Sequence, residues 1–201
     1  MSKRIYISAD YDSTSGDKNV VDELNRWGRD NKHSTDFVDM AKVISGSVSL
    51  NNNDCRPCEL KAEFNRQINS SSIVVFVVGD KTATRASGSS CGRANYSSFP
   101  TCTPYKQNTN GQKFCHYKYL YQDGGDVNVI NNYSYLRHEF EQAKKRGKTI
   151  VILYNSTRYE TSWLPSYMRG YENNAIPFWT TDVYGYKVGN YYQIKRALGY
   201  V

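Results

Sequence analysis

The chain has 201 residues, of which 39% are hydrophobic and 22% charged, and it carries a net charge of +7. This is the composition of an ordinary globular protein, and its length fits one large domain or one domain with an insertion. No apolar run approaches the length that spans a bilayer, and the N-terminus lacks the apolar core of a signal peptide. We therefore expect a cytoplasmic protein whose five cysteines are reduced thiols.

Apolar runs and helical spacings predict alternating strands and helices along the first 80 residues. A short strand at Arg4–Ser8 ends in a polar loop that reaches Asp17. The elements expected next are a helix through Val20, Leu24 and Trp27 that ends at Asn31 and Lys32, a strand at Thr35–Asp39, a helix opened by Pro57, and a strand at Ile73–Val78. The run IVVFVV at Ile73–Val78 has no polar alternation, which is typical of a central parallel strand covered on both faces.

Residues 82–132 interrupt this rhythm with a segment rich in Ser, Gly, Asn and Tyr. Because so long a structureless loop is uncommon in a compact domain, we interpret it as an insertion with some local structure. The pattern then returns. The expected elements are a helix from Tyr133 to Arg146 with Gly147 as its C-cap, a strand at Thr149–Tyr154, a short helical segment near Trp163–Arg169, a strand at Ala175–Trp179 and a helix at Tyr191–Leu198.

Alternation of strands and helices predicts an α/β fold of one domain over residues 1–201, with a central parallel sheet and helices on both faces. Ligands of such sheets bind beyond the carboxyl ends of the strands. Three polar segments are predicted to lie there, at Ser8–Asp12, Asp36–Lys42 and Gly79–Arg85.

The helix at 133–146 carries the candidate for chemistry. Leu136, Phe140 and Ala143 form its apolar stripe, and Glu139 lies about 60° around the helix from Leu136, at the border of that stripe. Tyr135 lies one turn before Glu139 on the same side. A carboxylate beside the core and an aromatic ring is a candidate ligand or catalytic group. The alternative, which the pattern alone favours, is a partly buried glutamate paired with Arg137 or another cation.

Three segments resemble TIR-like domains, most closely the TIR-like subunit of bacterial Thoeris antiphage systems. KRIYISADYD resembles the first strand and loop of the family, and INSSSIVVFVVGDKTATR resembles its central strand. YLRHEFEQAKKRGKTIVILYN resembles the helix with the catalytic glutamate and the strand after it. The family helix typically has Trp-x-x-x-Glu, and here Tyr135 and Glu139 keep that spacing. The resemblance covers about 1–80 and 133–155, and it implies a TIR/flavodoxin-like three-layer fold.

The resemblance also implies NAD⁺ chemistry of the glycohydrolase or ADP-ribosyl cyclase type. Family members cleave the nicotinamide–ribose bond, and Thoeris-like proteins turn the product into a cyclic or conjugated ADP-ribose messenger. It implies that Glu139 is catalytic and that Ser8, Asp10, Tyr11 and Tyr135 line the nucleotide site. Expected partners are NAD⁺, an effector protein reached through the product, a phage trigger protein and further copies of the chain. Neither a membrane nor nucleic acid is expected.

Other interpretations of the sequence remain open. A TIR-like module that acts by assembly without catalysis would also use the tyrosine-rich surfaces. Cys55 and Cys58, with Cys91, Cys102, Cys115 and His116, could hold zinc, but a second C-x-x-C is missing and no metal is expected. His33 and His138 are interpreted as surface residues. A receiver domain would need a lysine after the strand that ends at Tyr154, and this sequence has none there. A nucleic-acid binder would need a clustered stripe of basic residues, which the sequence also lacks.

Overall fold

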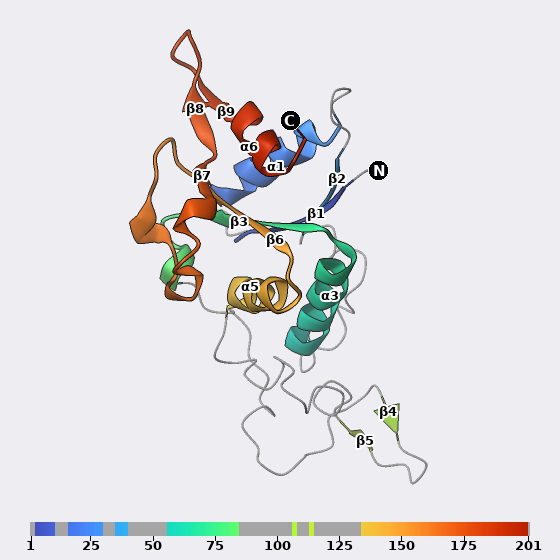
Figure 1. Ribbon diagram of the computed structural model, residues 1–201. Helices are drawn as coiled ribbons and strands as arrows, with labels where there is room; N and C mark the ends of the chain where they lie inside the picture. Colours follow the sequence, from blue (N-terminus) through green and yellow to red (C-terminus); the bar gives the residue numbers. More distant parts are fainter. Residues whose placement is uncertain are drawn as a thin grey trace.

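Five parallel strands form the central sheet of the molecule, in the spatial order β2-β1-β3-β6-β7 (Figure 1). The computed structural model describes residues 3–10, 16–29, 35–39, 56–84, 106–107, 113–114 and 134–200. The strands of the sheet are β1 (Arg4–Ser8), β2 (Asp36–Asp39), β3 (Ile73–Val78), β6 (Thr149–Tyr154) and β7 (Ala175–Pro177). Numbered along the chain within this sheet, they lie in the order 2-1-3-4-5, which is the flavodoxin-like order.

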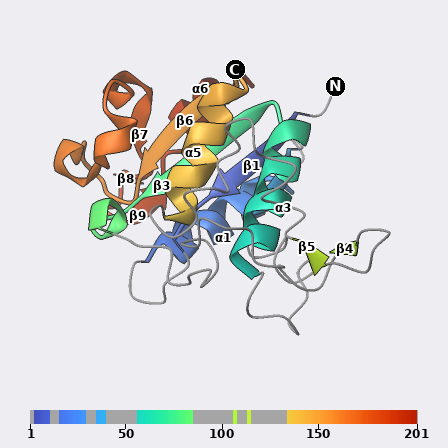
Figure 2. The same ribbon diagram turned by 90° about the horizontal axis from the view of Figure 1, so that it is seen from below.

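Helices pack on both faces of the sheet (Figure 1, Figure 2). The helices α1 (Asp17–Trp27) and α6 (Tyr191–Ala197) cover one face, and α3 (Arg56–Ser70) and α5 (Tyr135–Lys145) cover the other. Each pair encloses its own apolar core against the sheet. The α/β three-layer fold predicted from the sequence is therefore confirmed.

The central strand β3 serves both cores because strand side chains alternate between the two faces of a sheet. All six of its residues are buried. Val74, Phe76 and Val78 face α3 and α5, while Ile73, Val75 and Val77 face α1 and α6. An unbroken apolar run is thus what this position in the sheet requires, as the sequence predicted.

The helix that carries Glu139 has defined signals at both ends. Ser134 is its N-cap, and the Ser134 hydroxyl accepts a hydrogen bond of 3.1 Å from the backbone N–H of Arg137. After Lys145 the chain turns through Gly147 at φ 60°, a left-handed conformation that favours glycine. The predicted helix is therefore confirmed over Tyr135–Lys145, and its predicted first residue, Tyr133, lies outside the described residues.

The C-terminal third differs from the prediction in two places. The expected strand at Ala175–Trp179 is wrong beyond Pro177, since β8 (Trp179–Thr181) leaves the sheet and pairs antiparallel with β9 (Lys187–Gly189). Asn190 N donates to Phe178 O over 2.7 Å and closes this β8–β9 hairpin at its base. The segment near Trp163–Arg169 forms the 3₁₀ turns η3 (Thr161–Trp163) and η4 (Ser166–Met168) in place of one helix, and η5 (Glu172–Asn174) follows.

Two short strands are described inside the predicted insertion at 82–132. They are β4 (Lys106–Gln107) and β5 (Lys113–Phe114), which pair antiparallel, and the turn η1 (Thr82–Thr84) follows β3. The remainder of the insertion lies outside the described residues, as do Asn31, Lys32 and His33. The predicted end of the first helix at Asn31 and Lys32 is wrong, since α1 ends at Trp27 and a turn begins at Gly28. Over the part of the chain that is described, no helix combines the length and the apolar character needed to cross a bilayer.

Replacing Gly189 by alanine should destabilise the fold by about 1–3 kcal/mol through overpacking. A Cβ atom at Gly189 would lie 2.3 Å from Cζ2 of Trp27, and that ring is held at 5.3 Å from the Phe178 ring and 5.1 Å from the Tyr191 ring. Urea denaturation measures the loss, with Val188→Ala, at a neighbouring exposed position, as the control. An unchanged unfolding midpoint in Gly189→Ala would show that the hairpin base is not packed against Trp27.

Candidate functional site

The carboxyl ends of β1 and β3 define the site, because the chain changes direction across the sheet between these two strands. β1 pairs with β2 on one side and with β3 on the other. Such a switch point leaves a crevice beyond the strand ends, where open α/β sheets bind ligands. Ser8, the last residue of β1, lies beside Phe76 of β3, and Gly79 directly follows β3.

Glu139 reaches this edge from α5. Its carboxylate accepts two hydrogen bonds from β1, one on each oxygen. The hydroxyl of Tyr6 donates to Oε1 over 2.5 Å, and the hydroxyl of Ser8 donates to Oε2. Tyr6 and Ser8 are two positions apart on the strand, so both side chains point toward α5. The structure therefore brings together the predicted residues Ser8 and Glu139, and it adds Tyr6.

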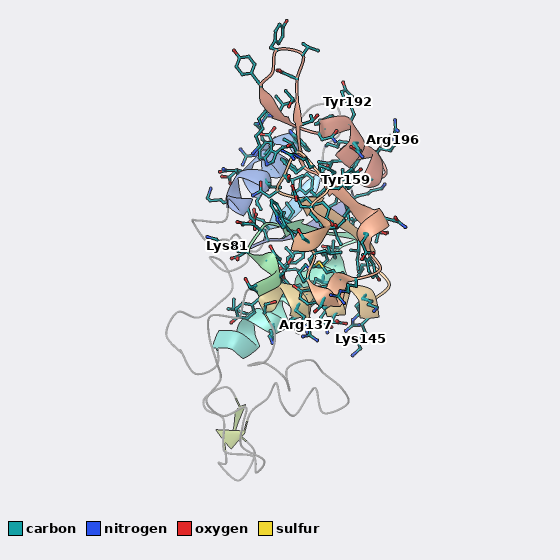
Figure 3. All side chains as sticks on the ribbon, turned by 90° about the vertical axis from the view of Figure 1, so that its left-hand side faces the viewer. Lys81, Arg137, Lys145, Tyr159, Tyr192 and Arg196 are labelled. Carbon is teal, nitrogen blue, oxygen red and sulfur yellow. The ribbon has the colours of Figure 1, made fainter. Side chains whose placement is uncertain are left out.

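No counter-charge accompanies the buried carboxylate among the described residues. Glu139 is 0% exposed, and no lysine or arginine of the described ranges forms an ion pair with it. The alternative of a partly buried glutamate paired with Arg137 is wrong, since Glu139 is fully buried and its carboxylate is held by the hydroxyls of Tyr6 and Ser8. Figure 3 labels Arg137 on the outer side of α5.

Burial sets the protonation of this carboxyl group. Loss of hydration disfavours the charged form and raises the pKa of Glu139 from 4.5 to about 7, while the hydrogen bonds from Ser8 and Tyr6 act in the opposite direction. At neutral pH the group is therefore divided between its acid and its carboxylate. Such a side chain can give up or accept a proton, or carry the negative charge that a cationic ligand needs.

Tyr135 lies at the entry to α5, one turn before Glu139. Its half-buried ring meets the ring of Phe64 from α3 edge-on, with centroids 5.7 Å apart. This contact joins the two helices on the Glu139 side of the sheet. Asp10 lies two residues past the end of β1 and is half-buried, whereas Tyr11 falls outside the described residues.

A second polar cluster occupies the same edge on the opposite face. Asp17, the first residue of α1, is 1% exposed, and its Oδ1 accepts a hydrogen bond of 2.9 Å from Nδ2 of Asn155. The indole N–H of Trp179 donates to Oδ1 of Asn155 over 2.8 Å. A Cβ atom on Gly79 would lie 2.7 Å from Oδ1 of Asp17, so any larger residue there would displace the Asp17 carboxylate. The cluster ties the start of α1 to β6 and β8.

Sequence reasoning missed Tyr6 and misplaced His138. Strand alternation places Tyr6 on the same face as Ser8, but nothing in the sequence indicates that this face meets Glu139. The surface position predicted for His138 is wrong: the side chain is 0% exposed, and its Nε2 lies 3.0 Å from Oδ1 of Asn65 in α3. The apolar stripe of α5 faces the sheet, but α3 covers a second side of the helix, and only tertiary packing reveals that contact.

No metal centre is found among the described residues, in which no group of three or more His, Cys, Asp or Glu side chains converges. The zinc alternative involved Cys55, Cys91, Cys102, Cys115 and His116, which lie outside the described residues, as does the side chain of Cys58. Neither the models of known protein families nor the curated proteins give a match to this chain. The function is therefore inferred from the geometry of the site and from the resemblance noted in the sequence.

Glu139→Gln should remove a pH dependence of stability that the native protein shows. The folded-state pKa of about 7 lies above the ordinary 4.5, so the contribution of this group is fully present below about pH 4.5 and is lost as pH rises through about 7. That shift corresponds to a difference on the order of 3 kcal/mol between the two ends of the window.

Urea denaturation of both proteins between pH 4.5 and 8.5 measures this difference. Glu141→Gln is the matched control, since Glu141 is on the same helix and partly exposed. The native protein and the control should lose stability relative to Glu139→Gln as the pH rises. Parallel stability curves for all three proteins would show that Glu139 ionises as readily in the folded chain as in the unfolded one.

Proposed function

We propose that this chain is a TIR-like enzyme of the cytoplasm that cleaves the nicotinamide–ribose bond of NAD⁺. In this proposal the ADP-ribose moiety becomes a cyclic or conjugated signal molecule of antiphage defence. The single observation that carries the proposal is the Glu139 carboxylate, buried and held by two β1 hydroxyls at the switch point of the sheet. This is the position at which flavodoxin-like sheets bind nucleotides.

The chemistry needs a negative charge beside the ribose. When the bond between C1′ and the nicotinamide nitrogen breaks, its electron pair leaves with nicotinamide and neutralises the pyridinium ring. Positive charge then develops on the ribose, as in glycoside cleavage. A carboxylate fixed in a water-poor site stabilises that charge at no cost of reorientation, and we assign this role to Glu139.

The product depends on what attacks C1′ next. Water gives free ADP-ribose, a nitrogen of the same molecule gives a cyclic product, and a second nucleophile gives a conjugate, each with release of a proton. Exclusion of water favours the second and third outcomes. The ring of Tyr135, fixed against Phe64, is assigned as a wall of the nicotinamide pocket. An effector protein would then read the product, so the partners of the enzyme are reached through a small molecule.

Glu139→Gln should abolish NAD⁺ consumption, with a loss of about 100- to 1,000-fold in rate, because the amide keeps the shape of the side chain but not its charge. The measurement is made in cells under phage challenge. Extracted small molecules are compared by mass spectrometry for NAD⁺ loss and for new ADP-ribose species. Glu141→Gln serves as the control. Intact protection with unchanged NAD⁺ in the native strain would remove the catalytic proposal.

The rate should also rise with pH. Since the carboxylate is the active form and the pKa of Glu139 in the free protein is about 7, kcat/KM for NAD⁺ should increase through pH 7 and level off above pH 8. Initial rates between pH 5.5 and 9 measure this profile with the activated enzyme. A rate that is flat across this range, or that falls as pH rises through 7, would contradict the assignment of the carboxylate as the active form.

One observation favours the second candidate, a TIR-like module that acts by assembly. The tip of the β8–β9 hairpin projects beyond α6 and carries strongly exposed apolar side chains (Figure 1, Figure 3). Val183 is 93% exposed, Tyr184 81% and Tyr186 69%. If Tyr184→Ser with Tyr186→Ser abolishes protection while Glu139→Gln retains it, assembly and not catalysis carries the function.

A further inference from the structure

The hydroxyl group of Tyr6 is not needed for packing of the core. It lies on β1 in the middle of the apolar core under α3 and α5, and its side chain is fully buried. A phenylalanine would fill the same space without a polar atom that must find a partner. The phenol is nevertheless satisfied, because its O–H donates to Oε1 of Glu139 over 2.5 Å.

The two hydroxyl donors on β1 each bind a different oxygen of the Glu139 carboxylate. Tyr6 takes Oε1 and Ser8 takes Oε2, so both oxygens are tied to one rigid strand at the centre of the sheet. A carboxylate offers about four lone-pair positions, and these two bonds use only two of them. Within the described residues these two hydrogen bonds hold the plane of the carboxylate in one orientation.

We propose that Tyr6 is a positioning residue, whose hydroxyl fixes the orientation of the Glu139 carboxylate and favours its charged form for the reaction. This inference rests on the proposed function for its catalytic meaning. Hydrogen bonding to a charged group favours that charged form, and the phenol therefore opposes the effect of burial. Without the phenol, Ser8 would be the remaining donor to this group among the described residues, and the carboxylate could turn about its last side-chain bond.

The other ionisable groups near Glu139 donate no hydrogen bond to its carboxylate within the described residues. Tyr167 of η4 lies near enough to feel the charge of Glu139, and burial, aided by that charge, raises the pKa of its phenol. His138 on the same helix points toward Asn65 of α3. Lys61 of α3 is fully buried and forms no ion pair with Glu139. The hydrogen bonds to Glu139 within the described residues come from Tyr6 and Ser8.

The chain provides a matched control for Tyr6→Phe. Tyr154 of β6 is also a fully buried strand tyrosine that faces the same core, yet its hydroxyl has no hydrogen-bond partner among the described residues. Tyr154→Phe therefore removes the same atom from the same core without touching Glu139. Both variants are expected to fold, since each keeps the aromatic ring, and circular dichroism checks this.

The first readout is the pKa of Glu139, followed by ¹³C NMR of its carboxyl carbon in the full chain. We expect Tyr6→Phe to raise this pKa by about one to two units, and Tyr154→Phe to leave it unchanged. The second readout is the pH profile of NAD⁺ consumption. Its midpoint should move upward by the same amount in Tyr6→Phe, with a fall of about five- to fifty-fold in rate at pH 7.

Each outcome decides between the claims. An unshifted carboxyl titration in a folded Tyr6→Phe variant overturns the proposal, as does a shifted titration with an unshifted rate profile. A shifted titration in a chain that never consumes NAD⁺, even under phage challenge, supports Tyr6 as the residue that positions Glu139 and removes the proposed function instead. Agreement of the two shifts supports both.

Discussion

The hydrogen bonds between β1 and the Glu139 carboxylate join the two parts of the molecule on which any chemistry depends. A buried carboxylate without a counter-ion is costly unless donors satisfy its oxygens. Tyr6 and Ser8 supply those donors from one strand, and the same bonds fix α5 over the switch point. The strand β1 therefore sets both the position and the pKa of the carboxyl group, because its hydroxyl donors hold the group in place and also oppose the rise in pKa that burial causes.

Much of the fold could be predicted, because its strongest signals are local. The unbroken apolar run at Ile73–Val78 is typical of a covered strand, and Gly147 marks the end of α5, whereas the cap at Ser134 was not predicted. The β8–β9 hairpin was missed since its strands are three residues each and its turn, Asp182 to Tyr186, is held by side-chain and backbone hydrogen bonds. Short antiparallel pairs leave little periodicity in the sequence.

The site was predictable in part. Features that depend on one element could be predicted, and contacts between elements far apart in the sequence could not. Glu139 was singled out from its place beside the apolar stripe of its helix and from the family resemblance, and Ser8 from its place at the end of the first strand and the same resemblance. That Tyr6 would meet Glu139 could not be read from the sequence, since 133 positions separate them and the contact depends on β1 lying next to β3. The burial of His138 likewise depends on how α3 and α5 pack.

The hydrogen-bonded chain from Asp17 through Asn155 to Trp179 gives the molecule a built-in optical probe. Indole emission responds to the partner of its N–H group, and Trp179 donates that proton to Asn155 at the carboxyl edge of the sheet. Lys187 lies 4.5 Å from the centre of the same ring and adds a charge to its surroundings. A change at the start of α1 that alters the hydrogen bond to Asn155 would therefore alter the surroundings of the Trp179 indole, whose emission is measured against that of Trp27 and Trp163.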